Sequence, residues 1–198
     1  MTRKEIIDAS AKIFSQKGYH GTSMQDIAGA VNLQKASLYH HVSSKQEILF
    51  ELLNRGLRLL TDEVEKSIDI ARSPDENLRQ AITAYLTALT EHQDVTSVLL
   101  LEYRSLESQY LKRHIIERDR FEQLWRNLID SGVQEKIFSC EDPSMAARAL
   151  LGVMNWTVTW FRSDGPMSAA EIADQITDLY LLGLTPRAVV VEGKFNSE

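Results

Sequence analysis

The sequence predicts an all-α protein of nine helices. A three-helix unit that contains a helix-turn-helix opens the chain, and a larger helical domain follows it. Apolar residues recur at helical spacing along most of the chain, and its 198 residues include only four prolines and nine glycines. We place the first unit at residues 1–47, the second at residues 48–184 and a tail at residues 185–198.

The helix-turn-helix is predicted at residues 22–49. Thr22 and Gln25 match a capping box at the start of its first helix. Asn32 then tolerates the left-handed conformation that a tight turn requires. A short second helix follows at residues 35–41. Two short helices joined by such a turn form a helix-turn-helix.

The other helices are bounded by residues that start or stop helices. Gly18, Gly132 and Gly183 are expected to end the first, seventh and ninth helices. Pro74 is expected to open the fifth, and Ser168 with its capping-box partner to open the ninth. The fourth helix has no break and should couple the two units rigidly. The expected spans are residues 3–17, 44–71, 74–92, 95–106, 108–131, 143–161 and 168–182.

Charge is unevenly distributed along the chain. The net charge is −6, but residues 1–47 carry six Lys or Arg against four Asp or Glu, so this unit is +2 and the remainder is −8. A weakly basic unit on an acidic body fits DNA binding through one small face.

No apolar run approaches the roughly 20 residues of a membrane span, so no membrane partner is expected. A single cysteine, Cys140, fits a reducing cytoplasm.

The N-terminal unit resembles the DNA-binding head of TetR-family transcriptional regulators. The matching residues stand in register without insertions: Thr22, Ile27, Ala28, Ala30, Lys35, Ser37, Leu38, Tyr39, His40, Lys45, Glu47 and Leu49. Gln34 stands where the family usually has Ser or Thr, so the recognition helix should be less well capped. The resemblance implies a double-stranded DNA operator as the partner.

Contacts to DNA are expected from two helix starts and the recognition helix. Backbone N–H groups at a helix start favour phosphate, whereas Gln can pair with adenine and Lys with guanine. The candidates are Thr22, Ser23, Gln34, Lys35, Ala36, Ser37, Tyr39, His40 and Lys45. In the competing interpretation, Thr22 is only a cap, part of Tyr39 is core, and His40 belongs to a solvated helix end.

Four segments of the body are informative, at residues 155–162, 165–168, 102–104 and 118–119. They resemble the TetR-family branch that senses acyl-CoA thioesters in fatty-acid or steroid breakdown. This resemblance implies a small-molecule effector, possibly an acyl-CoA, and no resident cofactor. An acyl chain needs an apolar slot, and its CoA phosphates need cations. The candidates are Leu60, Tyr85, Leu89, Leu100, Tyr103, Arg104, Phe121, Trp125, Met154 and Trp156. Each could instead be ordinary core or an ion-pair partner.

The last two helices are predicted to form a dimer interface. Small residues on the eighth helix permit close approach, and the ninth has an apolar face. The candidates are Ala146, Ala149, Leu150, Val153, Ile172, Ile176 and Leu179. A homodimer would present two heads to a palindrome. Alternatively, this face packs within one chain.

Two other functions compete with a ligand-released repressor. A helical enzyme is disfavoured because Cys140 has no nearby His and no catalytic triad spacing is visible. A metal site from His92, Glu102 and His114 is conceivable, but these residues lack a recognisable ligand spacing, and we assign no metal. The body could also dock a protein partner without binding a small ligand.

Overall fold

The computed structural model describes residues 2–185, and all regular structure in that range is helical. The predicted all-α class is confirmed. The helices are α1 (Arg3–Lys17), α2 (Met24–Ala30), α3 (Lys35–Leu38), α4 (Lys45–Ser67), α5 (Pro74–Glu91), α6 (Gln93–Leu101), the short 3₁₀-helix η1 (Tyr103–Ser105), α7 (Ser108–Gln134), α8 (Pro143–Trp160) and α9 (Ala169–Leu184). The expected tail falls outside the described residues except for its first residue.

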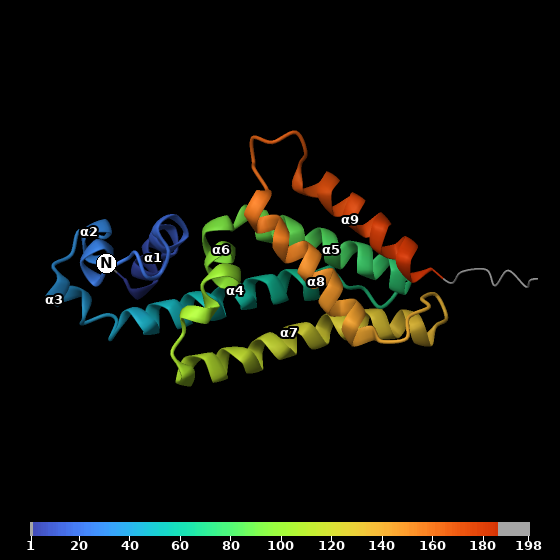
Figure 1. Cartoon of the computed structure of the whole chain (residues 1–198), viewed down its shortest axis with the longest axis horizontal. Coiled ribbons are helices and arrows are strands. Elements are labelled where there is room, and N and C mark those ends of the chain that lie inside the picture. The colour runs from blue at the N-terminus through green and yellow to red at the C-terminus, as the bar shows by residue number, and fades with distance from the viewer. Residues whose placement is uncertain (1, 186–198) are drawn as a thin grey trace, which may run out of the picture.

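The head consists of α1, α2 and α3 at one end of the molecule (Figure 1). Gly18 caps α1 at φ 73°, and Asn32 forms the turn at φ 53°, as predicted. The cap of α2 differs from the prediction: Ser23 is the N-cap, and Asp26 completes its capping box. The helix therefore begins one residue later than the Thr22 and Gln25 pattern indicates.

Helix α4 runs from the head into the body, where it contacts α5, α6 and α7 (Figure 1). Its 23 residues correspond to a length of about 35 Å. The buried stripe includes Leu49, Leu53, Leu57 and Leu60. The helix ends at Ser67 rather than near residue 71, because the following residue adopts an extended backbone.

Two glycines expected to end helices lie inside them. Helix α7 continues past Gly132 to Gln134, and α9 continues past Gly183. A Cβ atom on Gly132 would lie 2.2 Å from the ring of Phe138. This glycine therefore permits close packing of the following loop and does not terminate the helix. Ser168 caps α9 with Glu171, as predicted.

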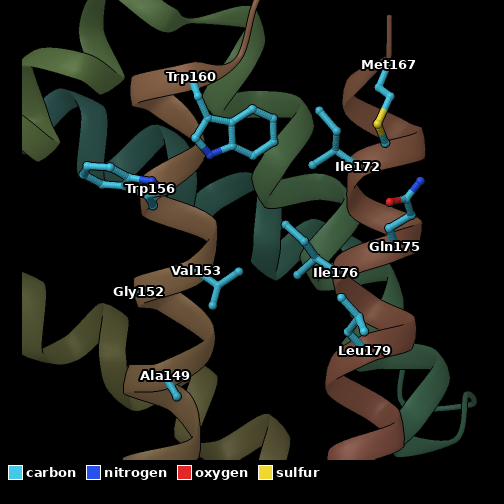
Figure 2. A pocket seen from close by; sticks show the side chains of 10 residues that line it. All are labelled: Ala149, Gly152, Val153, Trp156, Trp160, Met167, Ile172, Gln175, Ile176 and Leu179. Carbon is cyan, nitrogen blue, oxygen red and sulfur yellow. The ribbon is translucent and has the colours of Figure 1, made fainter.

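The body is a bundle in which α5 packs against α4 and α9, and α7 packs against α4, α5 and α8. Helix α6 ends at Leu101, earlier than predicted, and η1 carries the chain on toward α7. Helices α8 and α9 contact each other along one side of the body and leave a groove between them (Figure 2).

Candidate nucleic-acid interface and ligand cavity

The recognition helix α3 is one turn long and exposes most of its predicted reading face. Gln34, Lys35 and Ala36 are exposed, and Ser37 is half-buried. Leu38 is fully buried and anchors the helix to the head core. Gln34 makes no side-chain capping bond, as its identity predicts. Tyr39 is 47% exposed and His40 is exposed, so both side chains face solvent beside this helix.

The two candidates before α2 have different positions. Ser23 is exposed, and its hydroxyl oxygen accepts a hydrogen bond from the Asp26 N–H at 3.1 Å. The Ser23 hydroxyl and backbone N–H lower the pKa of Asp26 to about 2. Thr22 is buried, and its hydroxyl donates to the Gly18 carbonyl at 2.8 Å. The Thr22 hydroxyl therefore closes the turn after α1, and the phosphate contact expected from the backbone N–H groups of this helix start stays a prediction.

Lys45 joins the start of α4 to the loop after α1. Its ammonium donates to the carbonyls of Tyr19 and Thr22 at 2.8 and 2.6 Å and lies 4.2 Å from the centre of the Tyr19 ring. Burial lowers the pKa of Lys45. An ammonium has three N–H donors, so one remains for the predicted phosphate contact.

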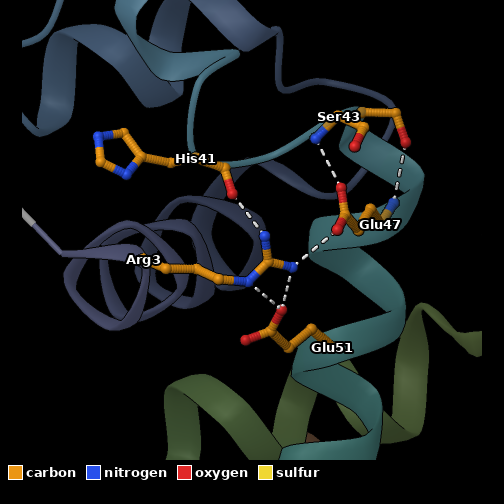
Figure 3. A network of polar contacts seen from close by, with 6 residues as sticks. Arg3, His41, Ser43, Glu47 and Glu51 are labelled. Carbon is orange, nitrogen blue, oxygen red and sulfur yellow. Dashed lines mark hydrogen bonds and ion pairs between the residues drawn. The ribbon is translucent and has the colours of Figure 1, made fainter.

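An arginine that the sequence interpretation missed joins the segment after the recognition helix to α4 (Figure 3). Arg3 donates to the His41 carbonyl at 2.5 Å, just beyond α3. It also pairs with Glu47 at 2.8 Å and Glu51 at 2.5 Å on α4. The hydrogen bonds that Arg3 donates to Glu51, and secondly to Glu47, raise the pKa of Arg3. Nothing local marks this role, since the partners lie 38 to 48 residues away.

A second set of long-range bonds joins the head to the segment between α6 and α7. The Tyr19 N–H donates to Glu102 at 3.0 Å, and the Ser105 hydroxyl donates to the same carboxylate at 3.1 Å. The Gln46 side chain donates to the Ser105 carbonyl at 2.8 Å and accepts from the Glu107 N–H at 2.9 Å. Residues 102–107 are thereby attached to both the α1–α2 loop and the start of α4.

The body contains a cavity of about 830 Å³ directly beside this segment. It lies among α4, α5, α6, η1, α7 and α8. Seven of the ten predicted ligand residues line it: Leu60, Tyr85, Leu100, Tyr103, Arg104, Phe121 and Trp156. Lining residues that the sequence interpretation did not assign include Leu57, Leu99, Arg148, Leu151 and Asn155.

Leu89, Trp125 and Met154 do not line the cavity, which corrects their assignment. All three are fully buried in the core beside it. Trp125 packs edge-on against Tyr85 and Phe121, at 5.6 and 6.2 Å between ring centres, and so supports two residues of the wall. Helical spacing placed these residues on the inward face of their helices, but that face is wider than the part that meets the cavity.

Charged residues of the cavity lie on its exposed side. Arg104, Arg118 and Arg148 are exposed, and Glu122 pairs with Arg148 at 2.8 Å. Three arginines against one glutamate leave the lining with a charge of about +2 at neutral pH. Burial lowers the pKa of His114, the one lining histidine, so its ring is neutral there. The cavity can therefore take an apolar group with an anionic end.

The conceivable metal site is not assembled. His114 lies on the cavity wall, whereas Glu102 bonds the head. Across residues 2–185, no three His, Cys, Asp or Glu side chains are grouped closely enough to hold a metal ion.

The groove between α8 and α9 has a volume of about 570 Å³ and an apolar lining (Figure 2). Five predicted interface residues line it: Ala149, Val153, Ile172, Ile176 and Leu179. Leu150 is fully buried, and the Ala146 carbonyl accepts a hydrogen bond from Tyr180 at 2.5 Å. Leu150 thus faces the chain's own core, which corrects its assignment, whereas Ala146 is half-buried and its place in the interface stays a prediction.

Comparison with known proteins accounts for both parts of this structure. A model of bacterial regulatory proteins of the tetR family matches residues 6–52, and a model of the tetracyclin repressor-like C-terminal domain matches residues 71–184. The chain belongs to the TetR family. The two matched regions correspond to the head and the body described above. Among residues 2–185, no helix is long and apolar enough to span a membrane.

Several TetR-family relatives match nearly the whole chain. The transcriptional repressor KstR2 of Mycobacterium tuberculosis is 28% identical over 189 residues, which cover 94% of each chain. The crystal structure of the regulator PfmR from Thermus thermophilus is 39% identical, with a TM-score of 0.83 and coverage of 91% of this chain and 99% of that one. The structure of AibR with isovaleryl coenzyme A and operator DNA is 26% identical, with a TM-score of 0.82 and coverage of 94% and 99%.

Proposed function

We propose that this protein is a homodimeric repressor that an acyl-CoA thioester releases from a palindromic operator. The observation that carries the proposal is the cavity, which combines an apolar wall with an arginine-bearing rim. The wall suits an acyl chain, and guanidinium groups suit phosphate. The relatives support this choice, since KstR2 is a repressor and AibR was crystallised with isovaleryl coenzyme A and operator DNA.

The cavity is joined to the DNA-binding head through residues 102–107. Leu101, Tyr103 and Arg104 line the cavity. Their neighbour Glu102 accepts a hydrogen bond from Tyr19 of the head, and the Ser105 carbonyl accepts one from Gln46. A ligand that favours one arrangement of this segment shifts the head with it. By linkage, a ligand that binds the released arrangement more tightly lowers operator affinity by the same factor.

The second subunit is expected to cover the groove between α8 and α9. Val153, Trp156, Trp160, Leu179 and Leu182 are 48–74% exposed in the single chain. Such a cluster of exposed large apolar residues is typical of an interface. Two subunits joined here would present two recognition helices to successive major grooves, which compensates for the small charge of each head.

We infer that the protein acts in the cytoplasm and has neither a catalytic role nor a resident cofactor. Its only small-molecule partner in this proposal is the effector. Native mass spectrometry of the protein as purified tests this inference, because a retained ligand or metal would appear as added mass.

A gel-shift assay on the region upstream of the gene tests the DNA-binding part. The wild-type protein should bind a palindrome there, and acyl-CoA thioesters should release it. Lys35→Ala should weaken binding by about 1–3 kcal/mol if Lys35 reads a base. Lys112→Ala, which removes the same charge from an exposed position in the body, is the matched control. Binding that is indifferent to acyl-CoAs would refute the effector and leave the DNA-binding role standing.

A further inference from the structure

The cavity wall contains a buried pair of polar side chains, in addition to the buried ring of His114. The Tyr85 hydroxyl on α5 donates a hydrogen bond to the Asn155 side-chain oxygen on α8. Tyr85 is 1% exposed and Asn155 is half-buried, and both line the cavity. Building on the proposed function, we propose that the acyl part of the effector carries an oxygen, as a hydroxyl or a ketone, which this pair binds.

The pair leaves hydrogen-bonding capacity open toward the cavity. Among residues 2–185, the Asn155 amide N–H₂ has no hydrogen-bond partner. Two polar side-chain atoms of residues 2–185 are sealed from solvent without a hydrogen-bond partner, Trp125 Nε1 and Arg126 Nε. The Asn155 amide is not one of them. Because Asn155 lines the cavity, its amide N–H₂ remains available as a donor to a ligand bound there. The Tyr85 oxygen, which donates its own proton to Asn155, retains lone pairs that can accept a hydrogen bond.

A saturated acyl chain does not match this wall. It would displace water from the Asn155 amide and offer no acceptor in return, and a buried donor left without a partner is destabilising. A ketone or hydroxyl oxygen accepts from the amide, and a hydroxyl can also donate to the Tyr85 oxygen. Sites that contain such groups discriminate strongly against analogues without the matching polar atom.

The arginines of the cavity lie apart from this buried pair. Tyr85 is buried and stacks on Phe121, with 5.9 Å between the ring centres, and Leu60 and Leu99 line the same cavity. The arginines Arg104 and Arg118 are exposed instead. The anionic CoA end and the acyl oxygen are therefore recognised by different groups, with the arginines at the rim and Tyr85 with Asn155 on the inner wall.

The test compares saturated, 3-hydroxy and 3-oxo acyl-CoA thioesters of equal chain length, over a series of lengths. Calorimetry gives their dissociation constants for the full-length protein, and gel shifts give the concentration that releases the operator. We expect the best oxygenated thioester to bind at least about tenfold more tightly than its saturated counterpart. Tyr85→Phe and Asn155→Leu should bring this ratio close to one by weakening the oxygenated ligand.

Tyr110→Phe is the matched control, because it removes a hydroxyl from a ring that packs on Phe50 away from the cavity lining. It should leave the ratio unchanged. Equal affinity for saturated and oxygenated thioesters, or a ratio that survives both cavity variants, would overturn the inference while the proposed effector class stands. If no acyl-CoA binds, the effector class and this inference fail together.

Discussion

The carboxylate of Glu102 accepts a hydrogen bond from the backbone N–H of Tyr19 at 3.0 Å, across 83 residues of sequence. Glu102 lies between Leu101 and Tyr103, which both line the cavity. Tyr19 begins the loop that Lys45 ties to α4. One residue of the body therefore connects the wall of the effector cavity to the part of the head that positions the helix-turn-helix.

Loss of this bond should weaken the response to the effector more than the binding of DNA. Glu102→Ala removes the acceptor for the Tyr19 N–H and for the Ser105 hydroxyl. If the bond carries about 1 kcal/mol of coupling, the effector concentration for half-release rises about fivefold. Glu102→Gln keeps an acceptor oxygen and should restore most of the response. Gel shifts with increasing effector measure the response to the effector and the binding of DNA. Glu91→Ala, on the exposed end of α5, is the control. Identical release curves for all four proteins would exclude this role.

We predict a subunit interface at the groove between α8 and α9, and a single charge placed there should disrupt it. Leu179 lines the groove and is 74% exposed in one chain. Leu179→Glu should therefore leave the fold intact but bury an unpaired carboxylate in the dimer, which is strongly unfavourable. Size-exclusion chromatography with light scattering should show monomers, and operator binding should fall sharply.

The matched control for this prediction is Ile70→Glu. Ile70 is fully exposed in the turn after α4 and does not line the groove. This variant should remain dimeric and bind the operator as the wild type does. A dimeric Leu179→Glu protein would place the interface elsewhere.

His114 should make stability depend on pH in the acidic range. Burial, and secondly the charge of Arg118, lower the pKa of this histidine. The unfolded chain takes up a proton near the ordinary histidine value of about 6.5, whereas the folded ring remains neutral to lower pH. Stability is therefore fully present above about pH 6.5 and decreases as the pH falls below it.

Thermal unfolding of wild type and His114→Gln between about pH 7.5 and about pH 5.5 measures this contribution. The melting temperature of the wild type should fall more steeply on acidification than that of the variant. The exposed His92→Gln variant controls for the loss of a histidine. Parallel curves for wild type and His114→Gln would show that His114 does not govern acid stability.

Gly132 should be one of the positions least tolerant of a methyl group. A Cβ there would lie within 2.2–2.8 Å of three atoms of the Phe138 ring, so Gly132→Ala should destabilise the fold by about 1–3 kcal/mol. Gly29→Ala is the contrasting variant, because its Cβ would meet nothing within 4 Å and alanine favours helix by up to about 1 kcal/mol. Chemical denaturation measures both, and a stable Gly132→Ala protein would show that Phe138 can move aside.

Features that depend on neighbouring residues were predictable from the sequence. The helical class follows from apolar spacing. The cap at Gly18, the turn at Asn32 and the helix starts at Pro74 and Ser168 follow from the backbone preferences of single residues. The recognition helix could also be located, because its residues are contiguous, although it ends at Leu38 and not near residue 41. These signals act within about one helical turn, so a sequence contains them directly.

Features that depend on which helices meet were decided by the tertiary structure. Apolar spacing cannot distinguish Leu60, which lines the cavity, from Leu89, which is sealed in the core, since both lie on inward faces. The bonds of Arg3 to Glu51 and of Glu102 to Tyr19 join residues 48 and 83 positions apart. Their partners are set by the packing of α1 against α4 and α6, which brings together side chains that no local pattern links.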